Sequence, residues 1–206
     1  MEYTKTQQQV IDILTDIYNL NITKPCHNER YLHHYFTENI QKKYPIFYDN
    51  LSQSKLHPEW ATSGKYRKND KEYLIDENGT SGHIDFALGD YENPDLCIEF
   101  KHNKSWNFQS IVFDFIKLMD SNNKIKSAIS FSIIYREKEL SNRLKLSEIN
   151  KTITEFTKRL DNKLDKNRPF LFWIIEIAPN SKTIQKQSWF CNSLDEKFML
   201  GFPNTT

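Results

Sequence analysis

Ten residues in the C-terminal part of the chain, PFLFWIIEIA at 169–178, restrict the fold more than any other segment. The run is almost continuously apolar, which is typical of a strand that is buried on both faces of its sheet. Such a strand lies inside a sheet that other elements cover on both sides. We therefore predict that 169–178 forms a central strand of a layered structure.

Helical and strand patterns alternate around this segment. Apolar residues recur at helical spacing in 5–20, 28–44, 108–119 and 146–164. Strands are predicted at 82–88, 95–101 and 126–135, two weak strands near 60–67 and 72–76, and an edge strand with a closing segment within 186–206. The early strands follow one another directly, whereas helices separate the later ones. This order predicts an α/β fold, a three-layer sandwich in which helices flank a central mixed β-sheet.

The length of 206 residues suits a single domain, 1–206. Within it we distinguish N-terminal helices in 1–45, a motif-bearing core in 82–135 and C-terminal strands in 169–206. The chain carries 28 basic and 27 acidic residues, a balance that argues against a polycation and still permits a local basic groove. Neither a signal peptide nor a membrane-spanning apolar run is evident, so we expect a cytoplasmic protein without a membrane partner.

Two of the predicted strands carry charged residues among apolar ones. HIDFAL at 83–88 contains Asp85, and LCIEFK at 96–101 contains Glu99 and Lys101. Because successive side chains on a strand point to opposite faces, the apolar residues of each strand should share one face and the charged residues the other. Paired residues on adjacent strands lie about 5 Å apart. We therefore predict that the three charged side chains converge within reach of one cation.

Such an arrangement suits phosphate chemistry. Two carboxylates offer hard oxygen ligands to Mg²⁺, which also accepts phosphate oxygens. A bound ion of this kind acts as a Lewis acid and generates a nucleophile from water. A lysine two residues further on can orient that water or stabilise charge on the phosphate. The alternative is an α/β protein unrelated to nucleases, in which the charges form salt bridges on a solvated sheet face.

The segments G-H-I-D-F and C-I-E-F-K together resemble the core motif of the PD-(D/E)XK, or restriction-endonuclease-like, nuclease superfamily. Its members have a mixed sheet flanked by helices, with one acid on a strand and (D/E)-x-K on the next. The resemblance implies a restriction-endonuclease-like core and Mg²⁺-dependent hydrolysis of phosphodiester bonds, with Mn²⁺ as a substitute. The proline that often precedes the first acid is absent, since His83 and Ile84 stand before Asp85.

The resemblance also implies individual roles. Asp85 and Glu99 match the two acids and would hold the metal ion, with the Phe100 carbonyl as a third ligand. Lys101 matches the lysine of the motif and would position the attacking water. DNA is the favoured substrate, and because many members act as dimers, a homodimer is one assembly that the resemblance implies. A catalytically inactive module that binds nucleic acid or a protein partner is the alternative function.

Two further residues are candidates because relatives often take polar groups from the helices on either side of the motif. Glu29 shares the apolar stripe of the helix 28–44, whereas Glu38 lies off it. An acid favoured by the dipole at the start of a helix is an equally open interpretation of Glu29. Gln109 begins the helix after the motif and either faces the site or faces solvent. Asp114 of that helix is expected to be exposed.

Basic clusters near the motif are candidates for contacts with nucleic acid. Lys and Arg side chains that hold phosphates supply the sequence-independent part of such affinity. The candidate residues are Lys65, Arg67, Lys68 and Lys104, and the aromatic residues Trp60, Tyr66 and Trp106 would either stack on bases or cover the core. The spacing of Cys26, His27, His33 and His34 matches no known zinc finger, so no zinc site is predicted. Cys97 is interpreted as a small packing residue.

Overall fold

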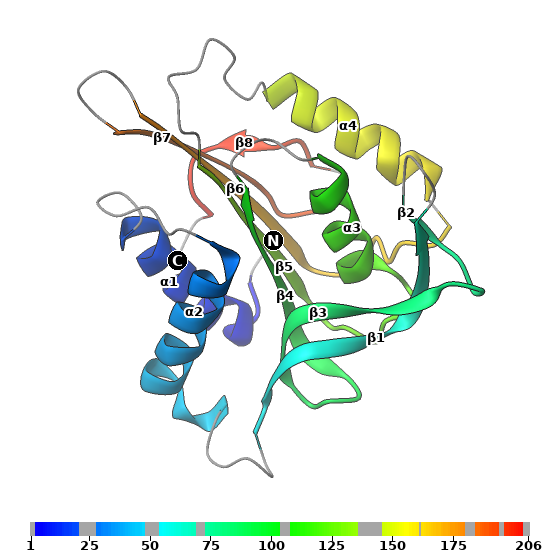
Figure 1. The fold of residues 1–206 in the computed structure, drawn as a ribbon, viewed down its shortest axis with the longest axis horizontal. Helices are drawn as coiled ribbons and strands as arrows, with labels where there is room; N and C mark the ends of the chain where they lie inside the picture. The colour runs from blue at the N-terminus through cyan, green and yellow to red at the C-terminus, as the bar shows by residue number, and fades with distance from the viewer. Residues whose placement is uncertain are drawn as a thin grey trace.

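The fold is described from a computed structural model, which places residues 3–20, 28–47, 54–68, 73–103, 108–135, 146–160, 162–179, 184–193 and 196–203. Eight strands form one mixed sheet in the order β2-β1-β3-β4-β5-β6-β7-β8. Helices α1 and α2 lie on one face of the sheet, and α3 and α4 lie on the other (Figure 1). The predicted α/β class, with helices around a mixed sheet, is confirmed.

The N-terminal part of the chain forms two helices, as predicted. Helix α1 spans Lys5–Leu20, and α2 spans Glu29–Lys43 and leads into a short 3₁₀ helix at Pro45–Phe47. Asn28 caps α2 because its side chain accepts the N–H of Tyr31 at 3.1 Å. The predicted apolar stripes of both helices are buried against the sheet.

The first half of the sheet is antiparallel. Strand β1 (Leu56–Lys68) pairs with both β2 (Tyr73–Ile75) and β3 (Thr80–Gly89), and β3 pairs with β4 (Pro94–Asn103). The two weak strands of the sequence therefore exist, and β1 is longer than predicted. Trp60 and Tyr66 of β1 are buried in the core, so these two aromatic rings cover the core and do not offer a free face to a base.

The second half of the sheet contains the parallel strands. Helix α3 (Phe108–Met119) connects β4 to β5 (Ala128–Tyr135), and α4 (Leu146–Arg159) precedes β6 (Phe170–Pro179). Both β4–β5 and β5–β6 are parallel pairs. Strands β7 (Ile184–Cys191) and β8 (Met199–Leu200) then add antiparallel pairs. The predicted helix 146–164 ends earlier, because Leu164 forms a bridge with Asp120 beyond the end of α3.

Two apolar clusters, one on each face, hold the sheet between the helices. One joins α1 and α2 to side chains such as Ile98 and Phe100, and the other joins α3 and α4 to Cys97 and its neighbours. Strand β6 lies between β5 and β7, and its side chains from Phe170 to Ile177 are all buried. The predictions of a central strand at 169–178 and of a packing role for Cys97 are therefore confirmed.

Candidate functional site

Strands β3 and β4 stop pairing just before the predicted acidic residues. The last pair towards Asp85 is Phe86 with Ile98, and beyond it the carboxylate of Asp85 accepts the backbone N–H of Phe100 at 2.7 Å. The side chain of Asp85 thus accepts an N–H of β4 that would donate to a backbone carbonyl of β3 if the two strands continued to pair. The charged residues therefore lie where the two strands separate, rather than on a flat part of the sheet.

The alternation of side chains along β3 breaks at the same point. Phe86 and Leu88 pack in the cluster of α1 and α2, as expected for one face, but Ile84 packs in the cluster of α3 and α4. The prediction that the apolar side chains of this strand share one face is wrong for Ile84. The change coincides with an irregularity in β1, where Glu59, between the partners of Ile84 and Phe86, has a left-handed backbone with φ +52°.

Four carboxylates, two lysines and a histidine meet at this place, and we call them the charged cluster. They come from α2, β3, β4 and α3, and comprise Glu29, His33, Asp85, Glu99, Lys101, Asp114 and Lys117. Counted with every acid ionised and His33 neutral, the four carboxylates exceed the two ammonium groups by two negative charges. This excess of oxygen-bearing charge is the property that a divalent cation would neutralise.

The two motif residues of β4 are bound to different partners. Lys101 Nζ lies 3.1 Å from Asp114 Oδ2 and 3.4 Å from Glu29 Oε2. Glu99 is buried and pairs with the ammonium group of Lys117. Lys117 also lies 3.2 Å from Asp114 Oδ1, so Asp114 links the two lysines.

Glu29 reaches the site from the first turn of α2. Its carboxylate accepts the backbone N–H of His102 at 3.2 Å in addition to its contact with Lys101. Both interpretations of Glu29 therefore hold: it lies in the first turn of α2, and its carboxylate also contacts the motif residue Lys101. Glu38, the competitor, is exposed and pairs with Lys42 on the same helix. The side chain of Gln109 lies outside the described part of the chain.

Asp85 pairs with His33, which the sequence did not indicate as a site residue. His33 Nε2 lies 3.3 Å from Asp85 Oδ2, and its ring packs against Phe86 and Phe100. Burial opposes ionisation of Asp85, but the bond to His33 and the Phe100 N–H together lower the pKa of Asp85. The same pairing, against the effect of burial, raises the pKa of His33.

The buried members of the cluster have strongly perturbed acidities. Burial, with the nearby charge of Asp114, raises the pKa of Glu99 well above its usual range, although Lys117 opposes this shift. Burial also raises the pKa of Asp114 against the two lysines. For Lys101, burial acts to lower the pKa, but the charges of Asp114 and Glu29 outweigh burial and raise it. Lys101 is therefore a permanent cation near neutral pH.

Asp114 and Lys117 correct the expectation for helix α3. Asp114 was expected to be exposed, but it is buried, as is Lys117, whose ammonium group also donates to the His83 carbonyl at 2.7 Å. A signal for this existed in the sequence. The two residues stand three apart, hence on one side of a helix that is otherwise almost wholly apolar.

The predicted contacts to nucleic acid are less well assembled. Lys65 is exposed opposite Ser81, four residues along β3 from Asp85, which corresponds to about 13 Å at the rise of a strand. Arg67 is exposed and pairs with Asp76 at 3.4 Å. The side chain of Lys68 and all of Lys104 lie outside the described residues.

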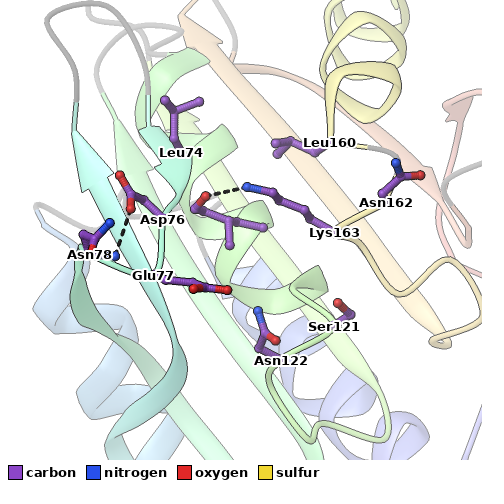
Figure 2. A pocket seen from close by; sticks show the side chains of 10 residues that line it. Leu74, Asp76, Glu77, Asn78, Ser121, Asn122, Leu160, Asn162 and Lys163 are labelled. Carbon is purple, nitrogen blue, oxygen red and sulfur yellow. Dashed lines mark hydrogen bonds between the residues drawn. The ribbon is translucent and has the colours of Figure 1, made fainter.

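A separate hollow of about 590 Å³ opens between β2 and the segment that follows α4 (Figure 2). Asp76 and Glu77 line it on the side of β2, Asn122 lines it beside Ser121, and Leu74 and Leu160 add apolar surface. Lys163 crosses it to donate to the Ile75 carbonyl at 2.8 Å. The predicted site residues do not line it. We therefore place the candidate chemistry in the charged cluster and not in this hollow.

Comparison of the chain with protein-family models, with curated proteins and with solved structures gives no match. Among the helices that the structure describes, none combines the length and the apolar character needed to cross a bilayer. The chemistry of the charged cluster therefore has to be inferred from its own side chains.

Proposed function

We propose that this protein is a metal-dependent nuclease, with DNA as the favoured substrate, and that its core is restriction-endonuclease-like. The observation that supports the proposal is the charged cluster, which contains the motif residues Asp85, Glu99 and Lys101. Lys101 contacts Glu29 and Asp114. Glu99 joins the cluster through Lys117, which also contacts Asp114, and Asp85 accepts the Phe100 N–H. The element order also fits such a core, because a helix and an antiparallel strand meander precede a helix and a parallel strand.

The donor set fits a hard divalent ion. The two acids of the motif offer carboxylate oxygens, and the cluster contains four carboxyl groups against two lysines. Asp85 and Glu99 would hold Mg²⁺, or Mn²⁺ in its place, with the Phe100 carbonyl as a third ligand. When bound, the ion would supply Lewis acidity and lower the pKa of a water molecule.

The remaining residues define what the protein contributes itself. Because Asp114 and Glu29 keep Lys101 charged, Lys101 serves as a hydrogen-bond donor that orients the attacking water and stabilises charge on the phosphate, not as a general base. Glu29 fixes the position of Lys101 and is itself fixed by the His102 N–H. This division of roles agrees with the roles that the motif implies for these residues.

A cleavage assay tests the proposal directly. Supercoiled plasmid, single-stranded DNA and RNA are incubated with the protein and Mg²⁺ or Mn²⁺, beside the variants Asp85→Asn and Lys101→Met. Glu38→Gln is the matched control, since it removes an exposed carboxylate from α2 that lies outside the cluster. We expect metal-dependent cleavage of DNA by the wild type and the control, and a loss of at least about a hundredfold in both site variants.

Two results would overturn the proposal. Metal-dependent cleavage that survives in both site variants would show that the charged cluster is not the active site. Absence of cleavage on every substrate, together with binding of labelled DNA in fluorescence anisotropy, would instead support a catalytically inactive module that binds nucleic acid.

A further inference from the structure

Glu29, His33 and Asp85 form a second group of ligand atoms within the charged cluster. One atom from each lies within 4.8 Å of the other two, and His33 Nε2 is 3.3 Å from Asp85 Oδ2. Glu29 and His33 stand four apart on α2 and therefore share one side of that helix. All three residues are partly exposed, but the ligand atom His33 Nε2 is itself buried and has no hydrogen-bond partner in the part of the chain that the structure describes.

The spacing of the three side chains suits one ion. Ligand atoms bind divalent ions at about 2.0–2.2 Å, so two ligands of the same ion lie roughly 3 to 4.4 Å apart. The three ligand atoms lie within 4.8 Å of one another, a limit close to this range. Two of the three groups are already oriented, because backbone N–H groups of Phe100 and His102 hold the carboxylates of Asp85 and Glu29.

The imidazole distinguishes this group from the acids of the motif. Mg²⁺ is bound almost entirely by oxygen, whereas imidazole nitrogen is a good ligand for first-row transition metals. The His33 ring is held between Phe86 and Phe100, at centroid distances of 5.3 and 5.6 Å, which keeps Nε2 towards Asp85. A site of one nitrogen and two carboxylate ligands therefore discriminates against Mg²⁺.

We propose that Glu29, His33 and Asp85 form a cation subsite that prefers transition-metal ions such as Mn²⁺ over Mg²⁺. The subsite shares Asp85 with the proposed catalytic site, and in that respect it rests on the proposed function. It adds a nitrogen ligand that the (D/E)-x-K motif does not contain. The consequence is that Mn²⁺ is the preferred ion of this protein and not only a substitute.

Ion binding can be measured without any cleavage. Wild-type protein is titrated with MnCl₂ while free Mn²⁺ is followed by electron paramagnetic resonance, and MgCl₂ is then added as a competitor. The matched variants are His33→Ala and His34→Ala, because His34 is the next residue on α2 and is exposed. We expect Mn²⁺ to bind at least about tenfold more tightly than Mg²⁺, and His33→Ala alone to lose about tenfold or more in Mn²⁺ affinity.

A second measurement needs no variant. Substoichiometric Mn²⁺ should broaden the ring resonances of His33 in the NMR spectrum of the wild type much more than those of His34. Three results would each overturn the subsite. The first is equal broadening of both rings, and the second is equal Mn²⁺ affinity of the two variants. The third is equal affinity of the wild type for Mn²⁺ and Mg²⁺. Binding of Mn²⁺ through His33 without any cleavage would keep the subsite and remove the nuclease, so the two failures are distinguishable.

Discussion

Replacing Lys117 with methionine tests whether the charged cluster is a coupled, buried network. Lys117 pairs with Glu99 and lies 3.2 Å from Asp114, and its ammonium group donates to the His83 carbonyl. Methionine preserves most of the volume of the side chain but removes the charge and these contacts. Glu99 then stays buried without its nearest cation and must either remain ionised there or take up a proton.

The loss of stability in Lys117→Met depends on whether Glu99 stays ionised or takes up a proton. A carboxyl group with a pKa of about 4.3 in the unfolded chain costs roughly 3.7 kcal/mol to protonate at pH 7, at about 1.4 kcal/mol per pKa unit. Breaking a buried ion pair by removing one partner generally costs about 3–5 kcal/mol. We therefore expect the Lys117→Met variant to unfold roughly 6–20 °C below the wild type, at about 2–4 °C per kcal/mol for a chain of this size.

The pH dependence gives the sharper test. Folded Lys117→Met protein holds a proton on Glu99, and the unfolded chain releases that proton above about pH 4.3. The folded variant therefore binds more protons than its unfolded chain. Over the part of the range from pH 7 to 5 in which Glu99 of the wild type is ionised, the deficit relative to the wild type should shrink by about 1.4 kcal/mol for each unit by which the pH falls. Urea unfolding followed by tryptophan fluorescence at several pH values measures this slope.

An exposed ion pair supplies the control for this experiment. Lys126 pairs with Asp95 at the surface, at 2.7 Å, so Lys126→Met removes a lysine and an ion pair without exposing a buried carboxylate. Its stability should stay close to that of the wild type. If Lys117→Met is as stable as Lys126→Met, or if its deficit does not change with pH, the description of Glu99 as a buried, compensated carboxylate is wrong.

Three further substitutions test the framework around the cluster by urea unfolding. Asn28→Ala removes the cap of α2 and should cost about 1 kcal/mol, and an unchanged midpoint would show that the cap does not hold this helix. Ile98→Ala, in the fully buried centre of β4, should cost about 2–5 kcal/mol, and a loss below about 1 kcal/mol would contradict close packing there. Gly64→Ala would press a methyl group onto the carboxylate of Asp120 and should cost about 1–3 kcal/mol, while Ser63→Ala on the exposed side of the strand should be neutral.

Periodicity was sufficient to predict the main elements of the fold. The apolar stripes of α1 and α2 and the continuous apolar run of β6 depend on burial of one or both faces, and burial is what hydrophobic patterns encode. The ends of the elements were harder to predict from the sequence. Helix α4 stops at Arg159 because the following turn packs on the end of α3, and this contact between distant segments leaves no local signal.

The site was predicted in part for a similar reason. Strand alternation correctly separated Glu99 and Lys101 from the apolar residues of β4, but it assumed that β3 is regular. The break at Asp85 lies opposite Glu59 of β1, and a left-handed conformation at a residue other than glycine has no sequence signal. The part played by His33 depends on this break, since Asp85 meets α2 only where the strands separate.

Several locally unfavourable features coincide at this one place. A left-handed glutamate, a break in the β3–β4 ladder and the buried charges of Glu99, Asp114 and Lys117 all occur around the separation of the two strands. Stability alone does not favour such a network, because apolar side chains of similar volume often replace a buried ion pair without loss. Local and global preferences in proteins conflict mainly at functional sites. The coincidence therefore favours a chemical role for the charged cluster over a purely structural one. Lys117 is the informative position to perturb first, because it belongs to this buried network and is not a motif residue.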